Sequence, residues 1–236
     1  MKPSVTLFIP ALNEIDGMRE IMPRVKREWV DQILVVDGQS TDGTAEFARK
    51  QGYEVYVQKE KGLRKAYNEG WPLIRGDIVV TFSPDGNCIP ELIPTLIEKM
   101  KEDYDMVIVS RYLNGARSED DNWITGFGNW FLTRVLTNGL HGGHYTDTMG
   151  IYRAYKTKLF YELGIDQDEA YAPEKFLFTV VGCEPLISVR MAKRKLKVTE
   201  IPGDEPKRPM GRSKLQIIRW GAAHVFQIVR ELWYWK

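Results

Sequence analysis

Cysteine is scarce in this chain of 236 residues, which contains only Cys88 and Cys183. Two thiols so far apart exclude a disulfide framework and a cysteine-rich zinc site, and they fit a reducing compartment such as the cytoplasm. Long hydrophobic runs are also missing. We therefore expect neither a signal peptide at the N-terminus nor a membrane-spanning helix.

A large charge of one sign is missing as well, because 33 Lys and Arg residues face 32 Asp and Glu residues, for a formal net charge of +1. We expect no nucleic acid partner, although local patches can still bind anions. Hydrophobic residues make up 43% of the chain and charged residues 28%, which excludes a disordered protein. The length suits one continuous domain with a sizeable core.

The first half of the chain alternates between short apolar runs and helical patterns. The pattern predicts strands over 5–9, 33–36, 54–57, 77–82 and 105–110, and helices over 17–29, 44–51, 62–74 and 91–101. This alternation is typical of parallel βαβ units. It predicts an α/β fold with a mostly parallel central sheet and helices on both faces. Ligands of such sheets bind where the strands end.

The second half is less regular. We expect helices over 126–140, 186–195 and 213–235, a strand over 197–201 and a loop over 202–209. Neither an internal repeat nor a low-complexity linker separates the two halves, so a single domain is the simplest interpretation.

Two loops at the predicted sheet edge carry oxygen ligands. Asp37 and Asp42 could accept hydrogen bonds from a base or a ribose, or could simply cap a turn and a helix. Asp85 and Asn87 could hold a divalent ion, or could belong to a plain Pro-Asp-Gly turn. Lys65, on the predicted helix over 62–74, could contact phosphate or line a solvated face.

Positive charge gathers near the C-terminus, where residues 190–214 contain nine Lys or Arg residues and three acids. Lys207, Arg208, Arg212 and Lys214 lie in or beside a loop rich in Pro and Gly. This placement favours an anion site over a solvated helix face, and arginine suits phosphate because its fork donates paired hydrogen bonds.

Seven segments, in order, resemble those of family 2 glycosyltransferases with the GT-A fold, over roughly residues 4–214. VTLFIPALNE resembles the opening strand and loop, ILVVDGQSTDGT the nucleotide loop, and GLRKAYNEG the helix behind the donor. GDIVVTFSPDGN stands where the family has its metal-binding DxD motif. DMVIVSRY, TDTMGIYR and VTEIP followed by RPMGRSK resemble segments of the polyprenyl-phosphate sugar synthases.

The resemblance implies an inverting transfer from a nucleoside-diphosphate sugar to a polyprenyl phosphate or related membrane-linked acceptor. It implies that the donor nucleotide contacts Pro10, Ala11, Asn13, Glu14, Asp37, Ser40, Asp42, Lys65, Ser83 and Pro84. It implies Mg²⁺ or Mn²⁺ at Asp85 and Asn87. The acceptor phosphate is expected to contact Arg111, Arg153, Arg208, Arg212, Ser213 and Lys214. The nucleotide-sugar half would span about 1–115 and the acceptor half 116–214.

The sequence departs from the family pattern at two acids, since Ser83 replaces the first Asp of DxD and Gly38 replaces the second acid of the nucleotide loop. The candidate catalytic residues are Asp85, Glu184, Asp147 and Arg111. A hydroxyl acceptor would need Asp147 or Glu184 as a base. Asp147 could instead cap a turn, and Glu184 could instead pair with Arg190. Transfer to a saccharide or small-molecule hydroxyl, or a non-catalytic sugar-nucleotide-binding protein, remain alternatives.

The predicted helix at the C-terminus, assigned to 215–236 as a separate amphipathic unit, has a polar stripe of Gln216, Arg219, Gln227, Arg230 and Tyr234. The broad apolar remainder could lie in a membrane interface, at the cytoplasmic face. It could instead pack onto the domain or onto a second copy in a homo-oligomer. Of these two interpretations, we favour packing over contact with a membrane.

Overall fold

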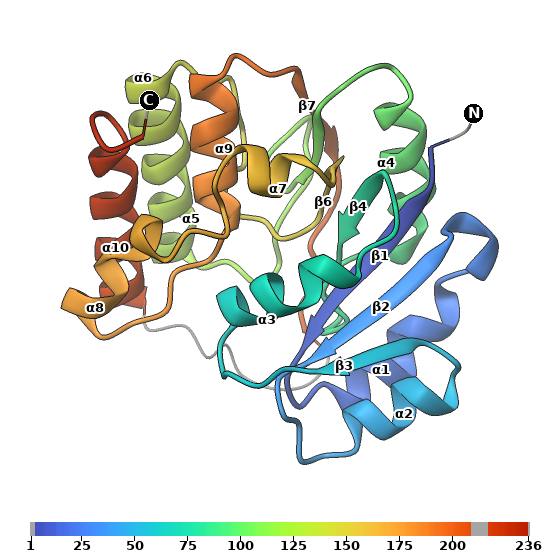
Figure 1. Ribbon diagram of the computed structural model, residues 1–236. Helices are drawn as coiled ribbons and strands as arrows, with labels where there is room; N and C mark the ends of the chain where they lie inside the picture. The colour runs from blue at the N-terminus through green and yellow to red at the C-terminus, as the bar shows by residue number, and fades with distance from the viewer. Residues whose placement is uncertain (1–2, 209–216, 236) are drawn as a thin grey trace.

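Seven strands form one sheet in the order β3-β2-β1-β4-β6-β5-β7 (Figure 1). The computed structural model describes residues 3–208 and 217–235. The strands are β1 (Val5–Ala11), β2 (Gln32–Asp37), β3 (Glu54–Val57), β4 (Ile78–Thr81), β5 (Met106–Ser110), β6 (Arg153–Lys156) and β7 (Val198–Pro202). Only β6 runs antiparallel to its neighbours, β4 and β5. The predicted α/β fold with a mostly parallel sheet is confirmed.

Short helices connect the strands. They are α1 (Ile15–Ile21), α2 (Thr44–Lys50), α3 (Leu63–Gly70), α4 (Ile93–Met100), α5 (Trp123–Trp130), α6 (Gly139–His141), α7 (Leu159–Glu162), α8 (Pro173–Leu177), α9 (Glu184–Lys193) and α10 (Ile217–Arg230). The 3-10 turns are η1 (Met22–Arg24), η2 (Arg27–Trp29), η3 (Trp71–Leu73), η4 (Pro90–Leu92) and η6 (Asp168–Tyr171). A π-helical stretch, η5 (Phe131–Asn138), continues α5 directly.

Two predicted helices are shorter than their hydrophobic spacing suggested. The helix expected over 17–29 ends at Ile21, and the helix expected over 62–74 ends at Gly70. Pro23 and Pro72 lie in the 3-10 turns that follow. Proline has no main-chain N–H to continue the α-helical hydrogen bonds, so each helix stops just before it.

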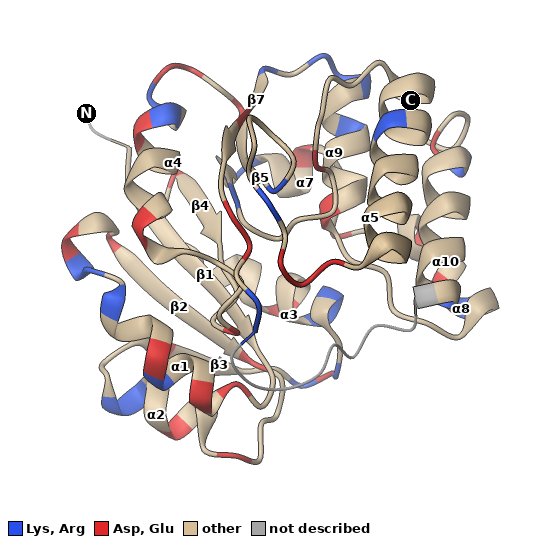
Figure 2. Ribbon diagram, turned by 180° about the vertical axis from the view of Figure 1, so that it is seen from behind, with Lys and Arg blue, Asp and Glu red and all other residues tan. Residues whose placement is uncertain are grey.

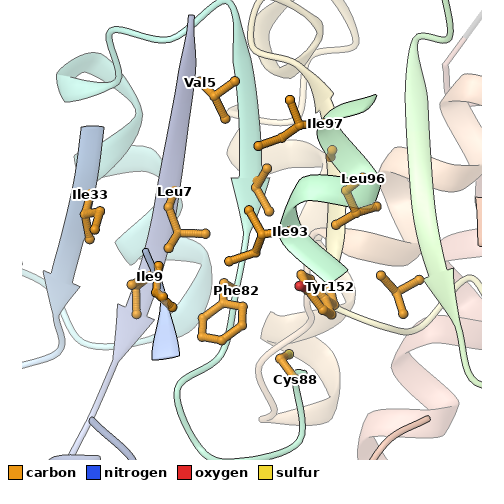
Figure 3. Close-up of a cluster of buried hydrophobic side chains, with 14 of the residues drawn as sticks. Val5, Leu7, Ile9, Ile33, Phe82, Cys88, Ile93, Leu96, Ile97 and Tyr152 are labelled. Carbon is orange, nitrogen blue, oxygen red and sulfur yellow. The ribbon is translucent and has the colours of Figure 1, made fainter. Parts of the chain in front are cut away.

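The sheet has an apolar core on each face, because successive side chains of a strand point to opposite sides. On one side Leu7 and Ile9 pack with Ile93 and Leu96 of α4, in the cluster drawn in Figure 3. On the other side Phe8, Leu34 and Val36 pack with residues of α3 and α9. This placement confirms helices on both faces and holds the strand ends rigidly.

The helices of the second half gather beside the sheet, where α5, α9, α10 and α8 form a layer of their own (Figure 1). The α10 helix contacts α8, α9 and η5, so the predicted packing of the final helix onto the domain is observed. Residues 213–216 of the predicted final helix lie outside the described part.

The polar stripe predicted for α10 does not coincide with the exposed face of the helix. Gln227 is buried, and its side-chain Nε2 donates to the carbonyl of Ala170 at 3.1 Å. Ile218 and Phe226 are exposed. The predicted division into an exposed polar stripe and an apolar remainder is therefore not observed over the described residues of this helix, since Gln227 and His224 are buried. Within the described ranges, no helix is both long and apolar enough to cross a bilayer.

Candidate active site

A cavity of about 930 Å³ opens where strands β1, β4 and β5 end. The loop after β1 contributes Asn13 and Glu14, and the loop after β4 contributes Ser83, Asp85 and Asn87. Further lining residues include Arg111, Ile124, Gly128, Leu132, Phe178, Val180, Glu184, Asp204, Glu205, Arg208 and Trp220. The carboxyl edge of the sheet is therefore the binding edge, as expected for parallel strands.

The loop after β4 presents an acid and an amide to this cavity. The Asp85 Oδ1 accepts a hydrogen bond from the Asn87 main-chain N–H at 3.2 Å. The Asn87 side chain is buried, and its Oδ1 has no hydrogen-bond partner among the described residues. The Asp85 Oδ2 lies 3.3 Å from Nε of Arg208. The carboxylate oxygens of Asp85 and the amide oxygen of Asn87 are ligand types that a hard divalent ion prefers.

Carboxylates are too few here to hold a metal by themselves. Across residues 3–208 and 217–235, no group of three His, Cys, Asp or Glu side chains is close enough to hold one. A cation at Asp85 and Asn87 would therefore depend on further oxygens, such as those of a diphosphate. Ser83 and Pro84 belong to the same loop, and Ser83 lines the cavity.

The α1 helix fixes the position of this loop. A side chain at Gly17 would overlap the carbonyl oxygen of Pro84. Only glycine allows the helix backbone to approach the loop so closely. The loops after β1 and β4 are thus held against each other.

Asp37 ends β2 and is almost fully buried. Its Oδ1 accepts from the Ser40 main-chain N–H at 2.9 Å, whereas its Oδ2 is buried and finds no partner in the described part of the chain. Ser40 in turn accepts from the Asn13 main-chain N–H at 2.9 Å, which ties the first two loops together. A buried carboxylate oxygen without a donor suits the N–H of a nucleotide base.

Asp42 has a capping role instead of the predicted nucleotide contact. Its carboxylate accepts from the Thr44 main-chain and side-chain groups at 3.0 and 2.6 Å, and from the Ile15 main-chain N–H at 3.0 Å. Burial alone would raise the pKa of this carboxyl, but these hydrogen bonds outweigh it and lower the pKa. The spacing could not distinguish this arrangement from a ligand contact.

Beyond Asp42, six predicted donor residues do not line the cavity: Pro10, Ala11, Asp37, Ser40, Lys65 and Pro84. Pro10 and Ala11 lie within β1, where Ala11 pairs with Asp37 of β2. Lys65 forms an ion pair with Glu60 at 3.1 Å. This ion pair favours the alternative of a solvated helix face, and the phosphate contact of Lys65 stays a prediction.

Arg111 and Asp147 form a buried, two-pronged ion pair. The Arg111 Nε lies 2.6 Å from Asp147 Oδ2 and its Nη2 lies 3.0 Å from Oδ1, while Nη1 lies 3.2 Å from Glu205. Burial works against charge on Asp147, but the Arg111 charge and hydrogen bonds prevail and lower the carboxyl pKa. Asp147 also accepts from the main-chain N–H groups of Met149 and Gly150. The prediction of Asp147 as a base is therefore wrong: it is a buried anion that caps a turn.

Arg153 is fully buried within β6 and does not reach the cavity. Its guanidinium donates to the carbonyls of Gly150, Thr148 and Glu184. The predicted contact with an acceptor phosphate is wrong because main-chain oxygens already engage this side chain. Its role is to join β6 to α9.

Glu184 begins α9 and lines the cavity with little exposed surface. Its Oε1 accepts from the Tyr67 hydroxyl at 2.8 Å. The alternative pairing of Glu184 with Arg190 is wrong, since Arg190 binds Glu231 at 2.9 Å. The role of Glu184 as a base for a hydroxyl acceptor stays a prediction, and its carboxylate is one of those that line the cavity.

The remaining acceptor residues divide between described and undescribed parts. Arg208 lines the cavity, whereas Arg212, Ser213 and Lys214 lie outside the described residues. Sequence reasoning missed Tyr67, Asp120 and Glu205, which contact the predicted site residues through long-range packing. A run of acids at 119–121 was the one local signal for Asp120.

The mixed sheet, its two-sided core and the polar loops at its carboxyl edge define an α/β enzyme of the GT-A fold class. The model of "Glycosyl transferase family 2" matches residues 6–164, and this chain belongs to that family. It is a glycosyltransferase, as the sequence motifs predicted.

Several curated proteins are similar over half of the chain or more. Glycosyltransferase AglJ of Haloferax volcanii is 27% identical over 96% of this chain and 71% of its own length. Undecaprenyl-phosphate mannosyltransferase of Micrococcus luteus is 28% identical over 93% and 94%. Dolichol-phosphate mannosyltransferase of Pyrococcus furiosus is 35% identical over 50% of this chain and 36% of its own.

Solved structures share the fold at low sequence identity. Glucosyl-3-phosphoglycerate synthase from Mycobacterium tuberculosis superposes with a TM-score of 0.67 at 17% identity, covering 98% of this chain and 80% of that one. Mannosyl-3-phosphoglycerate synthase from Rubrobacter xylanophilus gives 0.63 at 20% identity, covering 98% and 74%. These matches support the fold alone.

Proposed function

We propose that this glycosyltransferase moves a sugar from a nucleoside-diphosphate sugar to a polyprenyl phosphate or related membrane-linked acceptor, with inversion at the sugar C1. Two similar proteins are named for undecaprenyl phosphate and dolichol phosphate as acceptors. The argument for this chain, however, rests on its own cavity and on the surface around the cavity mouth.

The donor fits the loops after β1, β2 and β4. The unpartnered Asp37 Oδ2 would accept a hydrogen bond from the base. Asp85 and the unpartnered Asn87 Oδ1 would hold Mg²⁺ or Mn²⁺, and such an ion, when bound, neutralises charge that develops on the leaving diphosphate. A related fold has been solved with Mn²⁺ and uridine diphosphate, which supports this assignment.

Exposed aromatic residues near the cavity mouth carry the proposal of a membrane-linked acceptor. Phe178 lines the cavity and is 82% exposed, and Ile124 of α5 lines it as well. On the same helix Trp123 is 82% and Phe127 is 62% exposed. The α5 helix contains no charged residue (Figure 2). Water-facing aromatic groups at this density are typical of surfaces that contact lipid or another protein.

A phosphate acceptor does not require the protein to supply a catalytic base. Its oxygen is already ionised near neutral pH, so orientation matters more than proton removal. Arg208 lines the cavity and could turn toward such an anion. Glu184 would then have no proton to take, and its hydrogen bond with Tyr67 would serve to shape the cavity wall.

Transfer of labelled sugar to a lipid tests the proposal. The purified chain is incubated with UDP-, GDP- or dTDP-sugars, Mn²⁺ or Mg²⁺, and undecaprenyl phosphate in detergent. We expect label in the organic phase with at least one donor, lost when Asp85 is replaced in Asp85→Ala. Label found only in water-soluble products would overturn the membrane-linked acceptor.

A hydroxyl acceptor is the second candidate, because Glu184 is a carboxylate facing the cavity. The Glu184→Gln variant separates the two, since glutamine keeps an acceptor for Tyr67 but cannot take a proton. Transfer to a hydroxyl should fall by about 10²-fold or more. Transfer to a phosphate should change little. Nucleotide binding without turnover on any acceptor would instead favour the non-catalytic alternative.

A further inference from the structure

We propose that Asp120 supplies the second carboxylate of the cation site, and that the Arg208 guanidinium occupies the cation position between Asp85 and Asp120 when no metal is bound. The proposal rests on the divalent cation of the proposed function and adds two residues to its site. It also explains how this chain tolerates Ser83 in place of an acid.

Asp120 reaches the cation loop from a separate part of the chain, just before α5. Its Oδ2 accepts from the Asn87 Nδ2 at 3.3 Å. The same oxygen lies 3.4 Å from Nε of Arg208, which also lies 3.3 Å from Asp85 Oδ2. Two carboxylates from distant segments therefore share one cationic nitrogen.

The Asn87 amide is oriented by this arrangement. Its nitrogen must face the Asp120 carboxylate, since that group accepts hydrogen bonds and cannot donate them when ionised. The Asn87 oxygen is left buried, with the side chain only 8% exposed, and without a partner in the described ranges. Amide and carboxylate oxygens together form a ligand set that hard divalent ions prefer.

The Nε of Arg208 is held between the two carboxylates by charge, not by a directed hydrogen bond. This nitrogen is buried, yet it makes no hydrogen bond of acceptable geometry with any described residue. Arg111, by contrast, binds Asp147 through two short contacts. Mg²⁺ approaches carboxylate oxygens to about 2.0–2.1 Å and carries twice the charge of a guanidinium, so such an ion can replace this arginine. Arg208 released in this way would be available for a phosphate group.

Direct measurement of Mn²⁺ binding tests both residues without an activity assay. Mn²⁺ affinity is measured by electron paramagnetic resonance or calorimetry on the full chain, with and without UDP. Asp120→Asn should weaken Mn²⁺ binding by about tenfold or more. Glu119→Gln removes one negative charge from the neighbouring position and should leave the affinity within about twofold. Arg208→Met should tighten Mn²⁺ binding in the absence of nucleotide by several-fold.

The outcomes separate this inference from the proposed function. Wild-type affinity in Asp120→Asn, or no Mn²⁺ binding by the wild type, overturns the role of Asp120. Unchanged or weaker binding in Arg208→Met overturns the role of Arg208. Thermal unfolding of each variant shows whether a loss reflects misfolding. If Mn²⁺ binding follows the expected order but no sugar reaches the lipid, the proposed acceptor fails while the cation site stands.

Discussion

Two kinds of buried polar side chain differ in their hydrogen bonding: the loop side chains at the sheet edge in residues 3–104, the first part of the described chain, and the buried arginines in the remainder, the second part. In the first part, the loops leave Asp37 Oδ2 and Asn87 Oδ1 buried without partners. In the second part, Arg111, Arg153 and Arg190 are surrounded by acceptors. Buried polar groups normally find partners, so the two loop oxygens are candidates for ligand contacts, whereas arginines with satisfied hydrogen bonds have a structural role.

Breaking the Arg111–Asp147 pair should have the largest effect. Arg111→Met leaves a fully buried carboxylate without its cation, which should lower the free energy of unfolding by about 3–5 kcal/mol. Urea denaturation of the variant measures this loss. The double variant Arg111→Met/Asp147→Leu removes both charges and should recover part of it. A single variant as stable as the wild type would contradict a structural role for this arginine.

Acid should destabilise the second part through His224. Burial lowers the pKa of this imidazole to about 3, whereas the unfolded chain binds its proton below about pH 6.5. The unfolded state therefore holds more protons between these values, and stability is lost as the pH falls from 6.5 toward 3. The slope for this one group is up to about 1.4 kcal/mol per pH unit.

The pH dependence of unfolding in His224→Phe checks this slope. The difference in stability between wild type and variant should change with pH only below 6.5. His144→Gln, at an exposed position, is the control and should leave the profile unaltered. A profile of His224→Phe parallel to that of the wild type would show that His224 does not titrate on unfolding.

Asp37 and Asp42 provide a matched pair within one loop. Asp37→Asn should weaken UDP binding by about tenfold, because a charged acceptor for the base is lost, and should cost little stability. Asp42→Ala should keep UDP binding and lose about 1 kcal/mol of stability, because its carboxylate caps α2. Calorimetry and urea unfolding measure the two quantities. The reverse pattern would exchange the roles assigned to these acids.

The smallest effect is expected at Lys65. Its ion pair with Glu60 is partly exposed, so Lys65→Met should change the stability by less than about 0.5 kcal/mol. UDP affinity should not change either. A clear loss of affinity in the same calorimetric titration would restore the phosphate contact that the sequence suggested.

Local patterns predicted the first part of the fold better than the second. Apolar runs identified β1 to β4 in the first part and β5 just beyond it, and turn residues identified the loops at their ends. The β6 strand was missed because RAYK is short and places an arginine in the middle of the sheet. Proline could have ended the helix after Ile21, had it been weighed against the apolar spacing.

The partners of the charged residues could not be predicted, because they are distant in sequence. Arg111 meets Asp147 and Glu205, and Arg208 meets Asp120. Nothing in the spacing of a motif reveals such neighbours. The arginines of the motifs therefore could not be told apart in the sequence. In the structure Arg153 binds main-chain carbonyls, whereas Arg208 lines the cavity.

The buried contact between Arg190 and Glu231 limits how the C-terminal segment can behave. Both side chains are almost completely shielded from water, and they meet just beyond the last turn of α10. Detaching α10 would leave the buried guanidinium of Arg190 without its carboxylate partner. If α10 touches a bilayer, it must do so while fixed to the domain, and the cavity mouth would then keep a constant height above the lipid headgroups.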